Sequence, residues 1–423
     1  MTIHVSYAVM SHPIRRRLAE HVLAFLPKRD AIIVDDPCPF DPPATLRTSR
    51  LSWMSFASEA THHVVLQDDV EPCPYFADHV AAIAQACPDA VVALFTSWWS
   101  RNGGFVRLGA ARGDRLVYGI PEYVPTPALL MPRSTIENFL DFISSWQDPT
   151  EADDDVLQKF LESTNIPLLL SVPNLVQHLG VRSSVGNDSG GSREAAIFIG
   201  NLPSTYFQSP LGAGLYREVA CLYQGHAMMY IPDCQYVFES PPTFRNKWQD
   251  IYLEQDSSRV MSTNDDLLRL YNDDLSNISI SSVRRMMQLV PASALWSLWL
   301  YSLWLGQQTR AIGSDKLLPA VGSSVHHAMI SAALDSMIIG GLFPLADEAD
   351  LKLMLNEFRK IVDLGYSRGL TQSYEVSAAC GLAQGIPHLN TAISNSAHDK
   401  QSFAIAHSTC FRSKSQEHTS KGL

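Results

Sequence analysis

Cysteine is scarce in this sequence, and its few copies form no motif. There are seven cysteines, an odd number, and no two of them follow the C-x-x-C spacing. This scatter excludes a disulfide framework and gives no zinc site, because both need cysteines grouped at characteristic spacings. Unpaired thiols are typical of a reducing compartment, so we expect a cytoplasmic protein.

Positive charge is also in short supply. Lys and Arg number 32 against 43 Asp and Glu, which gives a formal net charge of -11. An unspecific nucleic-acid binder needs a basic surface, so we expect no nucleic-acid partner. Phosphate ligands held through a metal ion remain compatible with this charge. In the N-terminal stretch MTIHVSYAVMSHPIRRR the basic cluster follows the apolar run, which is the reverse of a signal peptide.

Long apolar runs are almost absent. The exception is residues 286–306, which are strongly apolar and lack charge over a length that could just span a bilayer. A proline, a glutamine and three serines interrupt this run, which favours a buried helix over the alternative of a membrane-embedded one. We therefore expect a homodimer in which Trp296, Trp299 and Trp304 are buried, and peripheral membrane association is left open.

What the sequence does contain is a regular alternation in its first part. Short apolar runs (3–10, 31–36, 63–69 and 90–97) alternate with amphipathic segments (14–26, 47–60 and 75–86). The alternation predicts an α/β domain over residues 1–182, with a parallel sheet wrapped by helices. Residues 98–119, which hold two tryptophans and several glycines, resemble a mobile loop followed by a hairpin.

The remainder of the chain has a different character. Residues 183–194 are rich in Ser, Gly, Asn and Asp, and we interpret them as a linker. Strand-like stretches follow, and then a long helical pattern, so residues 195–411 are predicted to form a mainly helical domain that binds an acceptor or forms the dimer. The polar residues 412–423 are expected to be a flexible tail.

Paired acids follow two of the predicted strands. Asp68 and Asp69 end the run HVVLQDD, and Asp35 and Asp36 end AIIVDD. In open α/β sheets, ligands bind outside the carboxyl ends of the strands. There an acid pair can hold a divalent cation, and a carboxylate can accept hydrogen bonds from a ribose. The alternative is that both pairs are solvated turns before prolines.

Two further features could belong to the same site. Asp153, Asp154 and Asp155 open a predicted helix, where capping and the helix dipole explain one or two acids but not three. Asp153 is the expected cap, and one of the others could be a base. His178 follows an apolar strand; a lone histidine is usually structural, but beside an acid pair it can complete a metal site.

The order of these features resembles the GT-A class of nucleotide-sugar glycosyltransferases, over about residues 1–190. IIVDD resembles the strand end that contacts the nucleoside, and VVLQDDV resembles the D-x-D metal motif with Gln67 at its first position. DDDVLQKFL resembles the acidic pair on the helix of the catalytic base, and VQHLG is similar to the H-x-G that supplies a late metal ligand.

The resemblance implies roles for single residues. Asp69 and His178 would bind the metal, Mn²⁺ in preference to Mg²⁺, because an oxygen-plus-imidazole site suits Mn²⁺ better. The base would be Asp155, with Asp154 as the other choice. The donor would be contacted by four residues: Asp35, Asp36, Arg50 and Asp68. Arg15, Arg16 and Arg17 are further candidates for the diphosphate.

The implied function is metal-dependent transfer of a sugar from a nucleotide-sugar donor to a saccharide or another hydroxyl-bearing acceptor, with inversion. The alternative is a catalytically silent nucleotide-sugar-binding or assembly protein with the same fold. A nucleotidyltransferase would want a Gly-rich loop after the first strand, and YAVMSHPIRRR has no glycine. Turnover of a donor sugar separates the first two readings.

Overall fold

The computed structural model describes residues 2–120, 122–146, 151–181, 192–208, 213–216, 219–230, 248–250, 264–311 and 323–371. All of these belong to one compact unit, Met1–Cys380. The predicted tail and most of the predicted linker lie outside the described residues. The predicted domain boundaries therefore stay predictions.

The main sheet is mixed. Its strands are β1 (Val5–Ser11), β2 (Ala31–Asp35), β3 (His62–Gln67), β5 (Val91–Ala93), β6 (Leu116–Tyr118), β7 (Ala128–Pro132), β8 (Leu168–Ser171) and β10 (Ala213–Gly214). Among the described residues they form eight strands in the order β10-β6-β8-β5-β7-β3-β1-β2. Strand β7 runs antiparallel between β3 and β5, and β6 runs antiparallel to β8. The α/β class is confirmed, but the expectation of a parallel sheet holds only for β2-β1-β3, β5-β8 and β10-β6.

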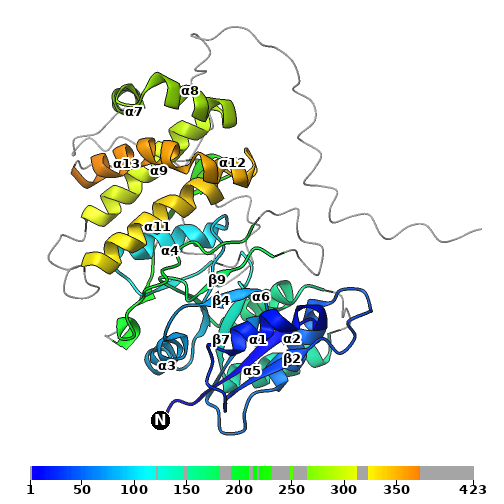
Figure 1. The fold of residues 1–423 in the computed structure, drawn as a ribbon. Helices are drawn as coiled ribbons and strands as arrows, with labels where there is room; N and C mark the ends of the chain where they lie inside the picture. Colours follow the sequence, from blue (N-terminus) through cyan, green and yellow to red (C-terminus); the bar gives the residue numbers. More distant parts are fainter. Residues whose placement is uncertain are drawn as a thin grey trace, which may run out of the picture. The chain divides into compact units, whose positions relative to one another are not determined.

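Helices accompany this sheet (Figure 1). They are α1 (Arg16–Leu23), α2 (Thr45–Met54), α3 (Phe76–Ala86), α4 (Arg101–Arg112), α5 (Arg133–Ser144) and α6 (Asp153–Thr164), with short 3-10 turns η1 (Pro13–Arg15) and η3 (Tyr206–Gln208). In β3, the consecutive residues Val64, Val65 and Leu66 are all buried. A strand covered on both faces reads as such a continuous apolar run, which is why the sequence pattern locates it well.

A small two-stranded ribbon stands beside the main sheet. It pairs β4 (Val70–Pro72) antiparallel to β9 (Val176–His178), with Val70 opposite His178. The backbone N–H of Leu179 also donates to the carbonyl of Asp69, at 2.8 Å. Because β4 follows β3 after only two residues, the ribbon brings His178 beside the acid pair.

The segment predicted as a mobile loop is instead a helix. Residues 101–112 form α4, and the Ser100 side chain caps it by accepting from the N–H of Gly103. Gly104 lies against the backbone of Ala220, where an added Cβ would be 2.8 Å from the carbonyl oxygen. The glycines therefore allow close packing of a buried helix, and they do not make a flexible lid.

The C-terminal region is helical, as predicted. It contains α7 (Asn264–Ser276), α8 (Ile280–Leu289), α9 (Ala292–Arg310), α11 (Ser323–Leu342), α12 (Glu348–Leu353) and α13 (Leu355–Thr371). These are the yellow-green to orange helices of Figure 1. A three-stranded sheet precedes them, made of β11 (Val219–Tyr223), β12 (His226–Tyr230) and β13 (Trp248–Asp250). The helices pack on the first part of the chain through α4, which contacts α9 and α11.

The uncharged run 286–306 is two helices and not one. It breaks at Pro291, where α8 and α9 meet at 107°. Trp299 and Trp304 are buried within the single chain, and the Trp299 indole N–H donates to Asp274 at 2.8 Å. One helix of the described residues, Ser324–Leu342, is long and apolar enough to cross a membrane, but 61% of its apolar window is buried inside the protein. Such burial is typical of a core helix of a soluble protein.

Candidate functional site

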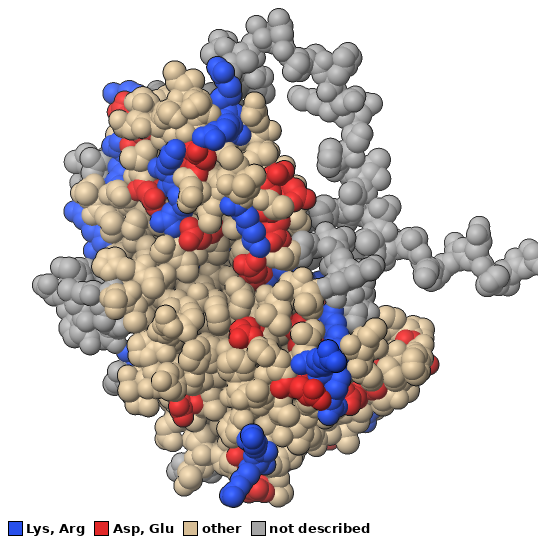
Figure 2. All heavy atoms as spheres, viewed as in Figure 1, with Lys and Arg blue, Asp and Glu red and all other residues tan. Residues whose placement is uncertain are grey.

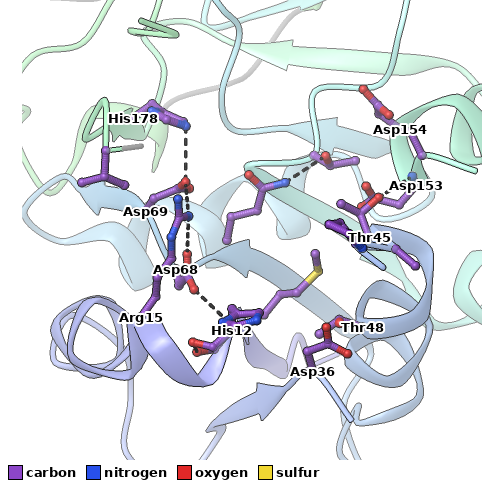
Figure 3. A pocket seen from close by; sticks show the side chains of 18 of the residues that line it. His12, Arg15, Asp36, Thr45, Thr48, Asp68, Asp69, Asp153, Asp154 and His178 are labelled. Atoms are coloured by element: carbon purple, nitrogen blue, oxygen red, sulfur yellow. Dashed lines mark hydrogen bonds and ion pairs between the residues drawn. The ribbon is translucent and has the colours of Figure 1, made fainter. Parts of the chain in front are cut away.

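A pocket of about 470 Å³ lies at the carboxyl ends of β1, β2 and β3. This end of the strands is where open α/β sheets bind their ligands. Figure 3 shows His178, Asp69 and Arg15 on one side of the pocket and Asp153 and Asp154 on the other. The charged and histidine side chains that line it are His12, Arg15, Asp36, Asp41, Asp68, Asp69, Asp153, Asp154, His178 and Arg193.

The acid pair is buried at the turn between β3 and β4. Asp68 and Asp69 are only 5% and 7% exposed. The backbone N–H of His12 donates to Asp68 Oδ2 at 3.1 Å, and Arg15 Nη1 contacts Asp68 Oδ1 at 3.2 Å and Asp69 Oδ2 at 2.9 Å. Burial raises the pKa of Asp68 to about 6, in spite of the neighbouring Arg15. Among the described residues, Asp69 Oδ1 is a buried oxygen without a hydrogen-bond partner.

His178 faces Asp69 across the ribbon. Its Nε2 lies 3.6 Å from Asp69 Oδ2, and its Nδ1 accepts the backbone N–H of Gly180 at 3.0 Å. Burial lowers the pKa of His178, so the imidazole is neutral near pH 7 and carries its proton on Nε2. For Nε2 to bind a metal, the proton must therefore move from Nε2 to Nδ1. Nδ1 must then give up the hydrogen bond that it accepts from the N–H of Gly180.

The second acid pair divides between two environments. Asp36 lines the pocket and accepts hydrogen bonds from Nε and Nη2 of Arg47, both at 2.8 Å. These hydrogen bonds lower the pKa of Asp36. Asp35 points elsewhere and pairs with Arg16 at 2.6 Å. Arg50 is exposed on α2 and does not line the pocket. Of these three predicted donor contacts, only Asp36 is in position to meet a ligand in this pocket.

The acidic triplet is also divided. Helix α6 begins at Asp153, but the cap position is Ala152 and no side chain caps the helix, so the prediction that Asp153 is the cap is wrong. Asp153 is buried instead, and its backbone N–H donates to Thr45 Oγ1 at 3.1 Å. Asp154 lines the pocket, whereas Asp155 is exposed and does not. The structure therefore brings the second choice for a base, not the first, to the acid pair's pocket.

The pKa of Asp154 fits a proton acceptor. Burial, followed by the nearby charges of Asp153 and Asp155, raises it to about 7. A carboxyl group with a pKa near the working pH can take up and release a proton during a reaction. Asp153 also has a raised pKa through burial, but it hydrogen-bonds with Thr45 and Ser49 and is tied to α2. Of the two, Asp154 is the carboxyl group that could exchange a proton with a ligand in the pocket, whereas Asp153 is held against α2.

Two pocket residues, His12 and Arg193, could not be identified from the sequence, and Arg15 was only one of several candidates. His12 directly follows β1 and holds Asp68 through its backbone, a role that any residue type can fill and that leaves no sequence signal. Arg15 is one of three consecutive arginines, and nothing in the sequence shows which of them faces the ligand. Arg193 lies in the Ser/Gly-rich stretch interpreted as a linker, although it lines the pocket.

The lining is predominantly negative. Six aspartates face two arginines, Arg15 and Arg193, so the pocket attracts cations and would repel a free diphosphate. The outer face in Figure 2 differs, because its described Lys and Arg are interspersed with Asp and Glu and neither sign forms a continuous patch. The pocket therefore gathers six acidic side chains where a metal-bound ligand could use them.

Two donor atoms fit a divalent cation at this pocket. The unpartnered Asp69 Oδ1 needs a ligand, and the His178 imidazole is neutral and adjacent. Among the described residues, no cluster of three or more His, Cys, Asp or Glu side chains is close enough to bind a metal by itself. A cation here would depend on water and on a bound diphosphate for its remaining ligands, as Mg²⁺ and Mn²⁺ often do.

Comparison with protein-family models gave no match to this chain, and comparison with curated protein sequences gave none either. A functional assignment must therefore come from the pocket itself. Three of its properties carry weight: its place at the strand ends, its buried acid pair beside His178, and the raised pKa of Asp154.

Proposed function

We propose that the protein is a divalent-metal-dependent glycosyltransferase of the GT-A class, which transfers a sugar from a nucleotide-sugar donor to a hydroxyl group. One observation carries the proposal: Asp69, His178 and Asp154, from three distant parts of the chain, line a single pocket at the carboxyl ends of the parallel strands. These are two predicted metal ligands and one of two predicted bases. A solvated turn or a capped helix start would not need to bring them together.

Asp69 and His178 would hold Mn²⁺ or Mg²⁺, with Asp68 next to the waters of the ion. The ion supplies stabilisation of the negative charge that builds on the departing nucleoside diphosphate. Arg15 and Arg193 are the lining residues that can add positive charge beside the phosphates. The Asp36 carboxylate can accept further hydrogen bonds beyond those from Arg47 and Cys38, so it can accept one from a ribose hydroxyl.

Asp154 is the proposed base. As a carboxylate it accepts the proton of the acceptor hydroxyl while the oxygen attacks the anomeric carbon. It lies across the pocket from the acid pair, which fits attack from the face opposite the leaving group (Figure 3). Attack from that face inverts the anomeric centre.

The silent nucleotide-sugar-binding alternative has one observation in its favour. Arg15 already forms ion pairs with both acids and offsets part of their charge, so the acid pair has a counterion without a metal. Turnover decides between the two functions. Nucleoside diphosphate released from a panel of nucleotide sugars, with Mn²⁺ and mixed saccharide acceptors, would be expected only from an enzyme.

The test needs a variant that separates metal binding from folding. Asp69→Asn should abolish Mn²⁺-dependent release of nucleoside diphosphate and leave a cooperative thermal melt. Full activity in this variant would disprove the metal assignment. Loss of the melt in metal-free buffer would mean instead that Asp69 is structural.

A further inference from the structure

The position of Arg15 in the pocket is unusual for a phosphate-binding residue. It ends η1 at the start of α1, and its side chain reaches both acids of the pair. The side chains of Arg15, Asp68 and Asp69 are 12%, 7% and 10% exposed, so the charges are largely removed from water. Two adjacent buried carboxylates repel each other strongly, and a cation between them is needed to keep both ionised.

A single nitrogen of Arg15 makes both contacts with the acid pair. Nη1 of Arg15 serves both Asp68 Oδ1 and Asp69 Oδ2. Arg47, by contrast, binds Asp36 through Nε and Nη2 together, the forked geometry that makes arginine–carboxylate pairs strong. The Arg15 contact lacks that fork on either acid. A competing cation would therefore displace Arg15 from the acid pair more readily than it would displace Arg47 from Asp36.

The Asp69 carboxylate is the point of competition. Its Oδ2 faces Arg15 Nη1 at 2.9 Å and His178 Nε2 at 3.6 Å, and its Oδ1 has no partner among the described residues. A divalent ion shared by this carboxylate and His178 would lie close to the guanidinium, and its charge would repel it. Both cations cannot keep their positions.

We propose that Arg15 and the divalent cation exclude each other at Asp69, and that cation binding releases Arg15 to the diphosphate of the donor. The inference rests on the metal site of the proposed function. Without metal, Arg15 is an internal counterion that keeps the acid pair in place. With metal, the guanidinium leaves the acid pair and pairs with phosphate, so metal and diphosphate strengthen each other's binding.

The first test measures binding of Mn²⁺ alone to the full chain, by the electron paramagnetic resonance signal of free Mn²⁺. Arg15→Gln removes the competing charge and should bind Mn²⁺ at least about tenfold more tightly than the unchanged protein. Arg15→Lys keeps a charge without the planar donors and should fall between. Arg16→Gln is the matched control, because Arg16 pairs with Asp35 outside the pocket, and it should bind like the unchanged protein.

Thermal melts in EDTA supply a readout that does not depend on activity. Arg15→Gln should melt at a lower temperature, since its acids are left without a counterion, and Mn²⁺ should restore the melting temperature.

In the second arm, inorganic pyrophosphate is titrated at saturating Mn²⁺. Its affinity should fall at least about tenfold in Arg15→Gln and stay unchanged in Arg16→Gln.

The outcomes separate this inference from the proposed function. If Asp69→Asn loses Mn²⁺ but Arg15→Gln binds it equally or more weakly than the unchanged protein, the metal site stands and the exclusion is disproved. If Arg15→Gln gains Mn²⁺ affinity but binds pyrophosphate normally, Arg15 does not move to the phosphates. If no variant binds Mn²⁺, the proposed function and the inference fail together.

Discussion

Asp154 shows how environment, more than residue type, assigns a role. Three consecutive aspartates open α6, and two of them, Asp153 and Asp154, line the pocket, but Asp153 is buried and bonded to α2, whereas Asp155 is exposed. Successive helical residues point about 100° apart, so the three cannot all face one ligand. The register that selects Asp154 depends on where the helix begins, and sequence patterns locate helix starts only to within a few residues.

The exchange Asp154→Asn tests the proposed base. It should lower the transfer rate by about 10²- to 10⁴-fold, the usual cost of losing a general base, and spare donor binding, which depends on the acid pair. Single-turnover kinetics together with donor titration measure both quantities. Asp155→Asn is the matched control and should turn over at close to the normal rate. A slow Asp155→Asn with a normal Asp154→Asn would move the base to Asp155.

The pH dependence follows from the pKa of about 7 at Asp154. A base acts as the carboxylate, so the rate should rise with pH through about 7 and level off above it. The effect of this group on folding stability changes with pH in the opposite direction. Between the ordinary pKa of 3.8 and the folded value of about 7, the folded protein holds a proton that the unfolded chain has lost. The contribution of this group is therefore full below pH 3.8 and is lost as the pH rises through 7.

Asp154→Asn removes this pH-dependent cost. The variant should gain at least about 1 kcal/mol of unfolding free energy relative to the unchanged protein at pH 8, and much less at pH 4. Urea unfolding at the two pH values measures the difference. An equal effect at both would show that the pKa of Asp154 is not raised in the folded protein.

At the scale of elements, the sequence identified what depends on local pattern. The apolar runs of β1, β2 and β3 and the acids at their ends could be predicted. Strands β1 and β3 are almost entirely buried and continuously apolar, as strands covered on both faces are, whereas β2 is a half-buried edge strand with an apolar sequence. The antiparallel course of β7 could not be predicted, since it is set by which neighbour completes the sheet and not by its own residues. The β4–β9 ribbon is equally non-local: it joins two three-residue strands that are far apart in the chain.

Helix α4 was predicted wrongly because glycine has two uses. In RNGGFVRLGAAR the glycines indicate a flexible loop if helix propensity is considered alone. In the structure Gly104 lies against Ala220, and Gly109 lies where an added Cβ would be 2.6 Å from Val117. The Gly104 contact is long-range, so no window of the sequence contains the information that explains this glycine.

The exchange Gly104→Ala tests this explanation. Alanine favours a helix by up to about 1 kcal/mol, but its Cβ would press on the backbone of Ala220, which cannot rotate away. We expect a net loss of about 1–3 kcal/mol in unfolding free energy, measured in urea. The control is Gly200→Ala, where an added Cβ meets nothing within 4 Å and the change should stay within about 0.5 kcal/mol. Equal stability of both variants would contradict close packing at α4.

At the scale of the whole molecule, the helical region and the pocket are separate features. Within the described part of the chain, no residue beyond Arg193 lines the pocket. The predicted role of the helices in acceptor binding therefore gains no support from this pocket. The predicted homodimer also stays a prediction, because Trp299 and Trp304 are already buried by their own chain and need no partner subunit.

The two parts are nevertheless packed together through a buried charge. Arg107 of α4 is 1% exposed, donates from Nε to Ser336 of α11 at 3.2 Å and from Nη2 to the carbonyl of Trp98 at 2.6 Å. Nothing in the pattern around Arg107 distinguishes it from a surface arginine. The sequence therefore predicted the classes of both parts correctly but not the interface that joins them.

The most direct measurement is a thermal-shift panel of nucleoside diphosphates and nucleotide sugars, each with and without Mn²⁺, on the unchanged protein and Asp69→Asn. A ligand at about 100 times its Kd adds roughly 2.7 kcal/mol of stability if it binds only the folded state. The account predicts at least one nucleotide sugar whose shift requires Mn²⁺ and disappears in Asp69→Asn. If no nucleotide ligand shifts the melt, or if the shift is indifferent to both Mn²⁺ and Asp69, the proposed glycosyltransferase site is contradicted.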